Sequence, residues 1–593
     1  AQVLSVNSLV GSGDAIEKST PYHVWRPTLY QLLHLEPGDG PDQRRLRVQQ
    51  ELEHFAKDAG QAERMQVLAP LLNAVLALDL PDNEITAQMS GEVRADNTRE
   101  LLVMLLQKAA RDAPLLLVLE DAHWFDSASW LVVRMVSQQV QPLLMVVTTR
   151  PFDGAPPVEY VQLKNDPAAV YFKLSALSHG STLALTCQRL GVASLPQPVV
   201  DFIYEKAEGH PFFSEELAYA LRDAGVIEVA NGVCRVAPHI DDLRALNFPY
   251  TIQGVIVSRV DRLTPQQQLT LKVASVIGRL FAYSTLRDVY PVEPDKPRLS
   301  EHLQTLERLD LTALTSIEPD LTYIFKHIIT QDVVYNLMLF AQRKQLHQAV
   351  AEWYEEQYAD DLSPYYPLLV HHWGKAENEQ KTLEYLDKAG EQALRDYANQ
   401  EAVDFFSQAL SMVTRSEAPV QVDRVRQAHW ERQLGEAHYG LGRMVEGRKH
   451  LMSALALVGY SVPNGFGLQV LRLVQQVLRQ VLHRLFPRVF LARSRHPGLR
   501  MEAADTYSQL AAVYYLSNDT TLLLLSTLST LNLAERVQVS PELARAYANM
   551  SSVASLIPWR KLALLYERRA WEILPLIHRP YEEAYASMVF AVQ

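Results

Sequence analysis

The chain has 593 residues, with 56 Lys and Arg against 68 Asp and Glu and a formal net charge of −12. Its length predicts several domains at ~100–200 residues each, and its 48% apolar and 21% charged residues are typical of a folded globular protein. The acidic balance argues against nucleic-acid binding by the chain as a whole. Only two cysteines are present, which excludes a disulfide framework and a zinc site built from cysteines.

The sequence has no run near the ~18 consecutive apolar residues that a membrane-spanning helix needs, and its few cysteines favour a reducing, cytoplasmic location. The first residues lack an initiator Met and the basic-then-apolar layout of a signal peptide. The last residues stop inside a helical pattern. We therefore expect this sequence to be a fragment of a longer protein.

The strongest local pattern is a short apolar run, Leu115–Leu119, followed by the acids Glu120 and Asp121. Such a run is typical of a parallel strand buried on both faces, and ligands bind at the carboxyl ends of such strands. One carboxylate can hold Mg²⁺ while the other polarises an attacking water, so Glu120 and Asp121 are candidate catalytic residues and candidate Mg²⁺ ligands. The alternative is an acidic turn that caps the helix beginning near Ser127.

A second apolar run, Leu143–Val147, is followed by Thr149 and Arg150. Because the carboxyl ends of parallel strands meet at one edge of a sheet, Arg150 is a candidate ligand of a γ-phosphate; an ordinary strand exit is the alternative. Together the two runs resemble the Walker B and sensor 1 strands of P-loop ATPases. The phosphate loop itself is not found, since the pair Lys18–Ser19 follows Glu17 where a glycine belongs, and this glutamate would repel phosphates.

Three segments resemble the predicted ATPases of the STAND class, namely Thr20–Pro27 (TPYHVWRP), Leu115–Trp130 and Val146–Pro151 (VVTTRP). These regulators occur behind class III adenylyl and guanylyl cyclase domains, soluble adenylyl cyclase included. The resemblance implies a site for ATP or ADP with Mg²⁺, in which Glu120 and Asp121 are the Walker B acids and Arg150 belongs to sensor 1. It also implies that the Walker A loop lies upstream of residue 1.

An amphipathic helix begins within residues 208–217, EGHPFFSEEL. In the resembling family a Gly-x-Pro motif at this place sets its proline against the adenine, which makes Gly209 and Pro211 candidate nucleotide contacts. A turn followed by a helix start is the alternative interpretation. Alternation around Asn231-Gly232 then predicts a short β-hairpin over Ile227–Val236.

The segment Phe248–Phe281 has helical spacing and resembles the family's entry into a winged helix. Its basic residues are mixed with acids and form no one-sided stripe, so we expect no DNA binding by this unit. The segment Tyr323–Asp332 resembles the one in which a histidine touches the β-phosphate of ADP, and His327 is the candidate. A histidine at the edge of a hydrophobic core is the alternative.

From about residue 345 onward the chain has continuous helical periodicity, with residues such as Gly390, Phe406, Gly435 and Leu451 at offsets typical of tetratricopeptide repeats. Small residues at these positions let paired helices approach closely. We therefore expect an irregular repeat array whose role is contact with a protein partner. The adjacent pair His371–His372 has no evident ligand partners and is interpreted as structural.

One part of the array, residues 467–500, holds seven arginines and no acidic residue. Its apolar residues from Val470 to Leu485 form one helical stripe, with Arg472 and Arg479 on the other side. A basic amphipathic helix can lie on an anionic membrane as a peripheral contact or dock on an acidic partner. The alternative, which the sequence favours, is an insert helix packed on the repeats with its arginines against acidic residues.

The predicted fold class is multidomain, with an incomplete α/β P-loop NTPase core, an α-helical lid, a winged helix and an all-α, TPR-like solenoid. The expected domains are residues 1–176, 177–245, 246–344 and 345–593, the last with a basic amphipathic insert at 461–500.

We expect an ATP-binding and ATP-hydrolysing regulatory module in signal transduction, whose nucleotide state switches contacts among core, lid and winged helix and sets a nucleotide-dependent oligomer. Hydrolysis is expected only if the full-length protein contains the Walker A loop. One alternative is a non-enzymatic interaction scaffold with a degenerate ATPase core. Others are the regulatory part of an adenylyl or guanylyl cyclase with its catalytic domain upstream, and a transcription regulator with a DNA-binding domain beyond residue 593.

Overall fold

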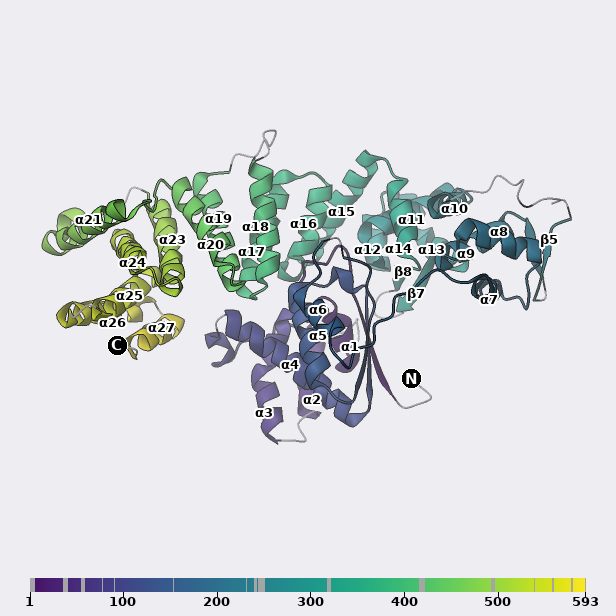
Figure 1. Cartoon of the computed structure of the whole chain (residues 1–593). Coiled ribbons are helices and arrows are strands. Elements are labelled where there is room, and N and C mark those ends of the chain that lie inside the picture. Colours follow the sequence, from purple (N-terminus) through teal and green to yellow (C-terminus); the bar gives the residue numbers. More distant parts are fainter. Residues whose placement is uncertain are drawn as a thin grey trace.

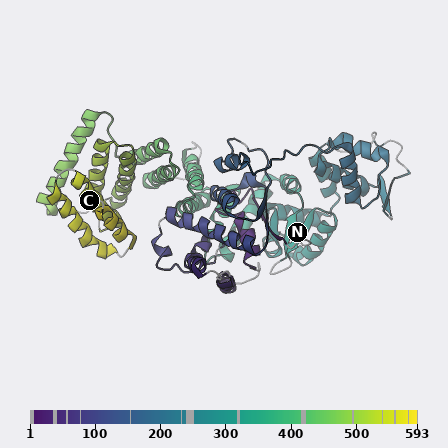
Figure 2. The same cartoon turned by 60° about the horizontal axis from the view of Figure 1, so that its bottom comes forward.

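A computed structural model describes most of the chain, in the ranges 6–35, 41–54, 59–76, 78–89, 91–152, 154–230, 232–238, 243, 251–316, 321–414, 422–491, 496–537, 539–556, 559–577 and 580–591. The described residues are mostly helical and fall into successive groups of elements (Figure 1). The helices of the C-terminal half form a long row, and the N-terminal α/β unit lies against the first helices of that row, near the middle of the molecule (Figures 1 and 2).

The N-terminal unit is a parallel sheet of three strands with helices around it. In spatial order the strands are β1 (Asn7–Ser12), β2 (Leu115–Glu120) and β3 (Leu143–Val147). The two strands predicted from apolar runs are confirmed, and β2 is central, which explains its uninterrupted apolar sequence. The helices of this unit are α1 (Trp25–Leu32), α2 (Pro41–His54), α3 (Ala59–Leu68), α4 (Gly91–Asp112), α5 (Ser127–Gln139) and α6 (Val158–Lys164).

Strand β3 forms an edge of this sheet within the described part of the chain. Its sequence is wholly apolar, yet Leu144 and Val146 are 63% and 40% exposed. Apolar strands of this kind normally lie inside an α/β sheet, and an apolar edge readily pairs with a further strand. The composition of β3 is therefore that of an interior strand.

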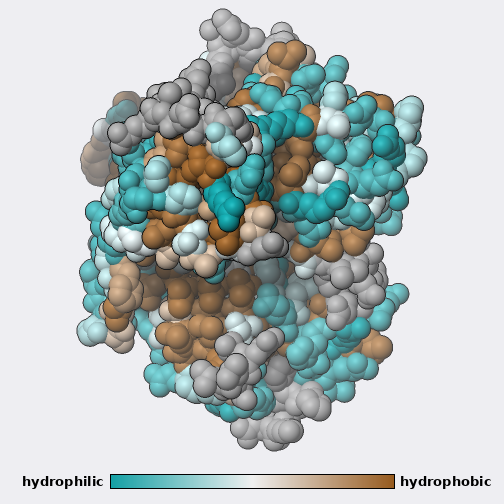
Figure 3. Space-filling model, turned by 90° about the vertical axis from the view of Figure 1, so that its right-hand side faces the viewer, coloured by the Kyte–Doolittle hydropathy of each residue, from teal (hydrophilic) through white to brown (hydrophobic). Residues whose placement is uncertain are grey.

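Helices α7 (His179–Leu190), α8 (Gln197–Ala207) and α9 (Pro211–Asp223) form a small bundle, followed by the hairpin β4 (Ile227–Ala230) and β5 (Val233–Val236). The predicted hairpin is confirmed, and Gly232 in its turn has a φ of 75°, which favours glycine; Asn231 lies outside the described residues. Seen from this end of the molecule, apolar residues gather around a recess between its upper and lower halves (Figure 3).

The next unit combines helices with a small antiparallel sheet in the order β6-β8-β7. Its first helix is tied to α9 by a buried ion pair, in which Arg259 Nη1 lies 2.6 Å from Glu216 Oε2. The elements are α10 (Ile252–Val260), α11 (Pro265–Ile277), β6 (Leu280–Ala282), α12 (Tyr283–Val289), α13 (Leu299–Arg308), β7 (Thr312–Ser316), β8 (Thr322–Phe325), α14 (Ile328–Asn336) and α15 (Phe340–Gln357).

The C-terminal half is an array of paired helices. A Cβ atom at Gly390 would lie 2.5 Å from the Phe406 ring, and one at Gly435 would lie 2.5 Å from Leu451. These contacts confirm the predicted close approach of small and large residues. The helices are α16 (Tyr366–Lys375), α17 (Glu379–Arg395), α18 (Asn399–Thr414), α19 (Arg424–Gly440), α20 (Met444–Leu457), α21 (Phe466–Leu485), α22 (Pro487–Phe490), α23 (Pro497–Leu516), α24 (Thr520–Ala534), α25 (Pro541–Leu556), α26 (Arg560–Ile577) and α27 (Pro580–Ala591).

The histidines of α16 belong to a buried ring cluster. His372 Nδ1 lies 2.9 Å from Nδ1 of His347, and the ring of His371 packs against both. Burial lowers the pKa of His347 to about 3 and that of His371 to about 4. The cluster is therefore uncharged near neutral pH and acts as packing, in agreement with the structural interpretation of the pair.

Helix α21 packs on the repeats, as the sequence favours, and Arg484 meets an acid there. Its buried residues are Gln476, Gln480 and His483, whereas its leucines and valines are mostly exposed. Arg484 lies 3.1 Å from the acid Glu535, but Arg472 and Arg479 are exposed. The helix does pack on the repeats, but through its polar face. In the described ranges we find no helix with the length and apolar character needed to cross a membrane.

Candidate functional site

The turn after β2 is held against the neighbouring strand by backbone contacts. Asp121 has a φ of 53°, in the left-handed region. Its N–H donates to Thr148 Oγ1 at 3.3 Å, and the N–H of Ala122 donates to the carbonyl of Thr148 at 2.8 Å. On the other side, a Cβ at Gly13 would lie 2.7 Å from the carbonyl oxygen of Asp121, so only glycine fits there. The carboxyl ends of the strands thus fix the position of Asp121.

The side chain of Asp121 is paired with an arginine from another unit. Arg279 precedes β6, and its Nη1 lies 3.1 Å from Asp121 Oδ2. Both side chains are partly exposed, at 23% for Arg279 and 30% for Asp121. Arg279 Nε is buried and has no hydrogen-bond partner among the described residues. Part of this guanidinium is therefore an unsatisfied donor at the strand ends.

The opposite charges of Arg150 and Asp332, from the same two units, lie near enough to each other to interact. Burial raises the pKa of Asp332 on α14, and the positive charge of Arg150 opposes that rise. Arg150 itself is exposed after β3, where its carbonyl oxygen accepts from Thr149 Oγ1 at 2.8 Å. The polar ends of β2 and β3 therefore both face the unit that contains α10–α15.

His327 lies next to this contact and beside the Gly-x-Pro segment. Its ring packs on Phe212, with the ring centroids 4.0 Å apart. Burial and the nearby charge of Lys326 lower the pKa of His327 to about 4, and the charge of Arg279 acts in the same direction. His327 is therefore a neutral imidazole near a group of cations.

The Gly-x-Pro segment itself is a tight turn. Gly209 has a φ of 73°, and a Cβ there would lie 2.2 Å from the carbonyl oxygen of Leu177. Pro211 is the first residue of α9 and is exposed, and His210 caps this helix by accepting from the N–H of Phe213. The geometry of this turn alone therefore requires glycine at position 209, independently of any ligand that the segment binds.

The structure brings some of the predicted residues together through Arg279. Asp121 contacts Arg279, whose charge reaches His327, and Phe212 links His327 to the Gly-x-Pro turn. Glu120, by contrast, is exposed at the end of β2. Arg279 was not predicted as a site residue, because its sequence context, a glycine between a helix and a short strand, carries no recognisable motif.

A second contact missed by the sequence analysis ties the acidic turn to the repeat array. Glu401 on α18 accepts hydrogen bonds at 2.7 Å from both the N–H and the Oγ of Ser127, the first residue of α5. Asp126 caps the same helix by accepting from the N–H of Ser129. Burial and the charge of Asp126 raise the pKa of Glu401 to about 7. The array therefore contacts the helix that directly follows Glu120 and Asp121.

The pair Lys18–Ser19 lies in a different place. The charge of Lys18 acts on His371 and Asp404 of the repeat array, and the residues just before and after the pair, Glu17 and Thr20, hydrogen-bond to each other. This pair therefore faces the repeats.

The donor set at the strand ends fits Mg²⁺ and phosphate in part. Glu120 and Asp121 offer the carboxylate oxygens that Mg²⁺ prefers, and Arg150 offers a guanidinium donor suited to phosphate. A glycine-rich phosphate loop is not found among the described residues.

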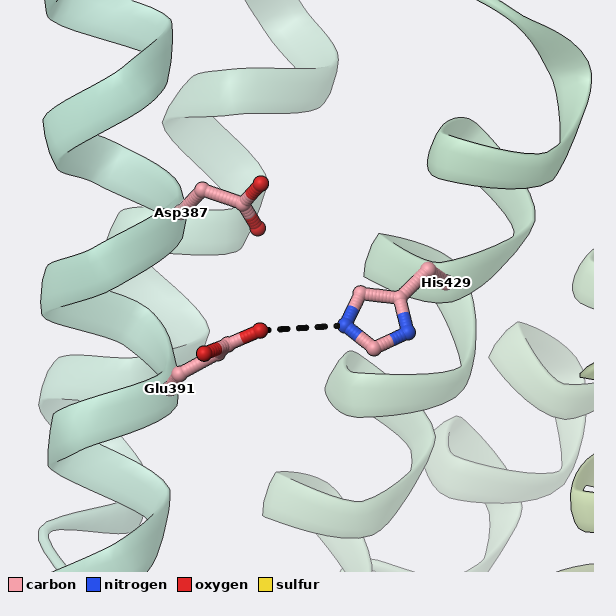
Figure 4. Close-up of side chains that lie close together, drawn as sticks. All are labelled: Asp387, Glu391 and His429. Atoms are coloured by element: carbon pink, nitrogen blue, oxygen red, sulfur yellow. Dashed lines mark ion pairs between the residues drawn. The ribbon is translucent and has the colours of Figure 1, made fainter.

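A cluster of metal-ligand residue types lies elsewhere, between α17 and α19. The ligand atoms of Asp387, Glu391 and His429 lie within 4.8 Å of one another (Figure 4). Burial opposes protonation of His429, but hydrogen bonds to Glu391 and Glu502 raise its pKa to about 9. A protonated imidazole does not bind a metal, and Arg426 already pairs with Asp387 at 3.0 Å. This cluster is therefore an ion-pair network.

Comparison with known proteins gives weak but consistent sequence similarity. The family described as "Domain of unknown function (DUF8739)" matches residues 179–235, which contain α7–α9 and the hairpin. Adenylate cyclase type 10 of Oryctolagus cuniculus is 19% identical over 258 residues, which are 37% of this chain and 16% of that protein. An uncharacterized protein of Rhizobium meliloti is 22% identical over 255 residues, 43% of this chain and 23% of that one.

Among solved structures, a crystal structure of a signal transduction ATPase with numerous domains and a tetratricopeptide repeat sensor, from Pyrococcus horikoshii, aligns with 99% of this chain and 77% of that chain. Its sequence identity to this chain is 10%, and its TM-score is 0.36. The matched region spans less than a fifth of the length of the first cyclase. Part of the chain is similar to adenylate cyclase type 10, in line with the occurrence of its motifs behind class III cyclase domains.

Proposed function

We propose that the chain is the nucleotide-responsive regulatory module of a larger, cytoplasmic signal-transduction protein. The observation that carries the proposal is the ion pair between Asp121 at the strand ends and Arg279 of the neighbouring unit. A bound Mg²⁺-nucleotide competes with Arg279 for the carboxylate of Asp121. A switch requires only that the nucleotide binds with different affinity to the arrangement in which Asp121 and Arg279 are paired and the one in which they are apart.

Each candidate residue takes a stated role in this proposal. Glu120 and Asp121 hold Mg²⁺ and orient a water, and Thr149 and Arg150 contact the γ-phosphate. Gly209 and Pro211 form the adenine side of the site, and His327 donates to the β-phosphate. ATP, when bound, supplies a phosphoryl group. The transfer of this group to water changes the negative charge next to these residues.

A phosphate loop is proposed to come from a segment that residues 1–593 do not contain. The exposed apolar residues Leu144 and Val146 of β3 support this, because a further strand at this edge, together with its connecting helix, covers them. ATP hydrolysis is proposed only for a protein that contains such a loop.

The units that surround the site are proposed to move as two bodies, the N-terminal α/β unit and the combined residues 177–344. We assign residues 177–245 as the lid and 246–344 as a winged helix without a DNA-binding role. Glu216 and Arg259 join the two, and their side chains are only 2% and 4% exposed. Separating a buried pair of this kind costs about 3–5 kcal/mol. The lid and winged helix therefore stay together, and the partly exposed pair Asp121–Arg279 opens.

The repeat array is proposed to bind a protein partner. Its contact with α5 through Glu401 gives a route by which a partner on the array changes the acidic turn. The similarity to adenylate cyclase type 10 supports a place beside a cyclase domain. A nucleotide-dependent oligomer is part of the same proposal.

Calorimetry with Mg-ATP and Mg-ADP tests the proposal. Two chains are compared, the present one and one extended upstream by a strand–loop–helix unit of about 30–50 residues. Binding by the extended chain alone supports a site completed by a phosphate loop. Binding by neither chain overturns the proposal and leaves an interaction scaffold.

A further inference from the structure

Helix α21 has an exposed apolar stripe, which we define as Leu471, Val474, Leu478, Val481 and Leu485. These residues recur at alternating intervals of three and four, so they share one face of the helix. Leu471, Leu478 and Leu485 are 55%, 58% and 64% exposed. The exposed residues Phe486 and Val489 continue the apolar surface beyond the end of α21. A contiguous apolar surface of this kind marks a site of contact.

The opposite face of α21 is fixed to the repeats by buried polar contacts. Gln480 Nε2 donates to Asn532 Oδ1 at 2.9 Å, and Asn532 Nδ2 donates to Gln476 Oε1 at 2.7 Å. His483 Nδ1 lies 2.8 Å from Glu535 Oε2, and both of these side chains are 2% exposed. Rolling the helix to bury its stripe would leave these groups unpaired, which is costly in a buried site. The array therefore holds the stripe outward.

The surroundings of the stripe are positively charged, although the chain as a whole carries −12. Residues 467–500 contain seven arginines and no acid. Arg472 and Arg479 each follow a stripe leucine, so they lie about 100° round the helix from that leucine, on the flank between the stripe and the buried polar face. They also line a cavity of about 190 Å³ together with Tyr507. Burial and the charges of Arg500 and Arg479 lower the pKa of Arg536, a sign of a locally positive field.

We propose that α21 docks in the plane of an anionic membrane. The stripe enters the boundary between headgroups and acyl chains, and the long side chains of Arg472 and Arg479 reach lipid phosphates from the flank of the helix. In both views of the ribbon, α21 lies at the outer edge of the array, with space beyond it (Figures 1 and 2). A second copy of the chain is disfavoured as the occupant, because two arginine segments without acids repel each other.

The test is flotation of the intact chain with two kinds of vesicle, phosphatidylcholine alone and phosphatidylcholine with an equal amount of phosphatidylserine. One variant carries Leu471→Ser and Leu478→Ser, and another carries Arg472→Gln and Arg479→Gln. The matched control carries Val445→Ser and Leu564→Ser, which are 69% and 55% exposed on other helices. All these side chains are exposed, so the helical circular dichroism is expected to stay unchanged.

Wild type and control are expected to float with the phosphatidylserine vesicles and not with phosphatidylcholine alone. The leucine variant is expected to lose at least about tenfold in partitioning, and the arginine variant about thirtyfold, from about 1 kcal/mol per arginine near an anionic surface. Absence of flotation by the wild type overturns the proposal. Equal flotation of the leucine variant and the wild type also overturns it. A third contradicting result is a wild type that binds neither kind of vesicle but sediments as a dimer, which the leucine substitutions dissociate.

Discussion

The contact between Glu401 and Ser127 predicts that the docking of the repeat array on α5 depends on pH. Burial and the charge of Asp126 raise the pKa of Glu401 from 4.5 to about 7. The docked state therefore holds a proton that the separated state releases, so docking weakens as the pH rises from 4.5 to 7 and stays weak above that. A difference of this size corresponds to about 3 kcal/mol.

The substitution Glu401→Gln removes this ionisation and keeps an oxygen for the N–H of Ser127. Relative to wild type, we expect docking at about pH 8 to be stronger by about 2 kcal/mol, after about 1 kcal/mol is subtracted for the lost charged hydrogen bond. Below about pH 5 the two proteins should differ by less than about 1 kcal/mol. Asp126 also titrates beside Glu401, and comparing the two proteins isolates the contribution of Glu401.

Hydrogen exchange of the peptide that contains Ser127, corrected for intrinsic exchange rates, gives the free energy of local opening at each pH. The control is Glu301→Gln, an acid whose side chain is 71% exposed, which should not change protection of this peptide. If the wild type and Glu401→Gln show the same change in protection between about pH 5 and about pH 8, the reasoning about the buried carboxylate is wrong.

Two further predictions concern packing. Arg259→Ala leaves Glu216 as an unpaired buried charge and should destabilise the α7–α9 bundle and its neighbouring unit by about 3–5 kcal/mol, measured by urea unfolding. The exposed control Arg298→Ala should have almost no effect, and equal unfolding midpoints for the two variants would contradict this prediction. Gly390→Ala forces a Cβ to 2.5 Å from Phe406 and should cost about 1–3 kcal/mol. Gly180→Ala, with no atom within 4 Å, should leave the melting temperature unchanged or higher, and a similar loss in both would refute the close-packing argument.

Patterns that depend on local sequence were predicted correctly. The apolar runs at Leu115–Leu119 and Leu143–Val147 gave β2 and β3 because a wholly apolar run of that length fits a buried parallel strand. The hairpin β4–β5 followed from alternation around a turn. Gly390 and Gly435 were found because close helix pairing needs a small residue at a fixed offset.

Contacts between units could not be predicted, because they depend on how distant segments meet. Arg279 and Asp121 are 158 residues apart, and Ser127 and Glu401 are 274 apart. Strand β1 was also missed, since its sequence NSLVGS has no long apolar run. The face on which α21 packs could not be predicted, because periodicity defines an apolar face without saying whether the protein buries it.

The most direct test of the account is Mg²⁺-dependent binding of ADP to the full-length protein, measured by calorimetry for wild type, Asp121→Asn and Arg279→Gln. Asp112→Asn is the control, at the end of α4. The account predicts that Asp121→Asn loses at least about tenfold in affinity with Mg²⁺ present, and that Arg279→Gln binds Mg-ADP more tightly than wild type. Equal Mg-ADP affinities for wild type, Asp121→Asn and Arg279→Gln would contradict it.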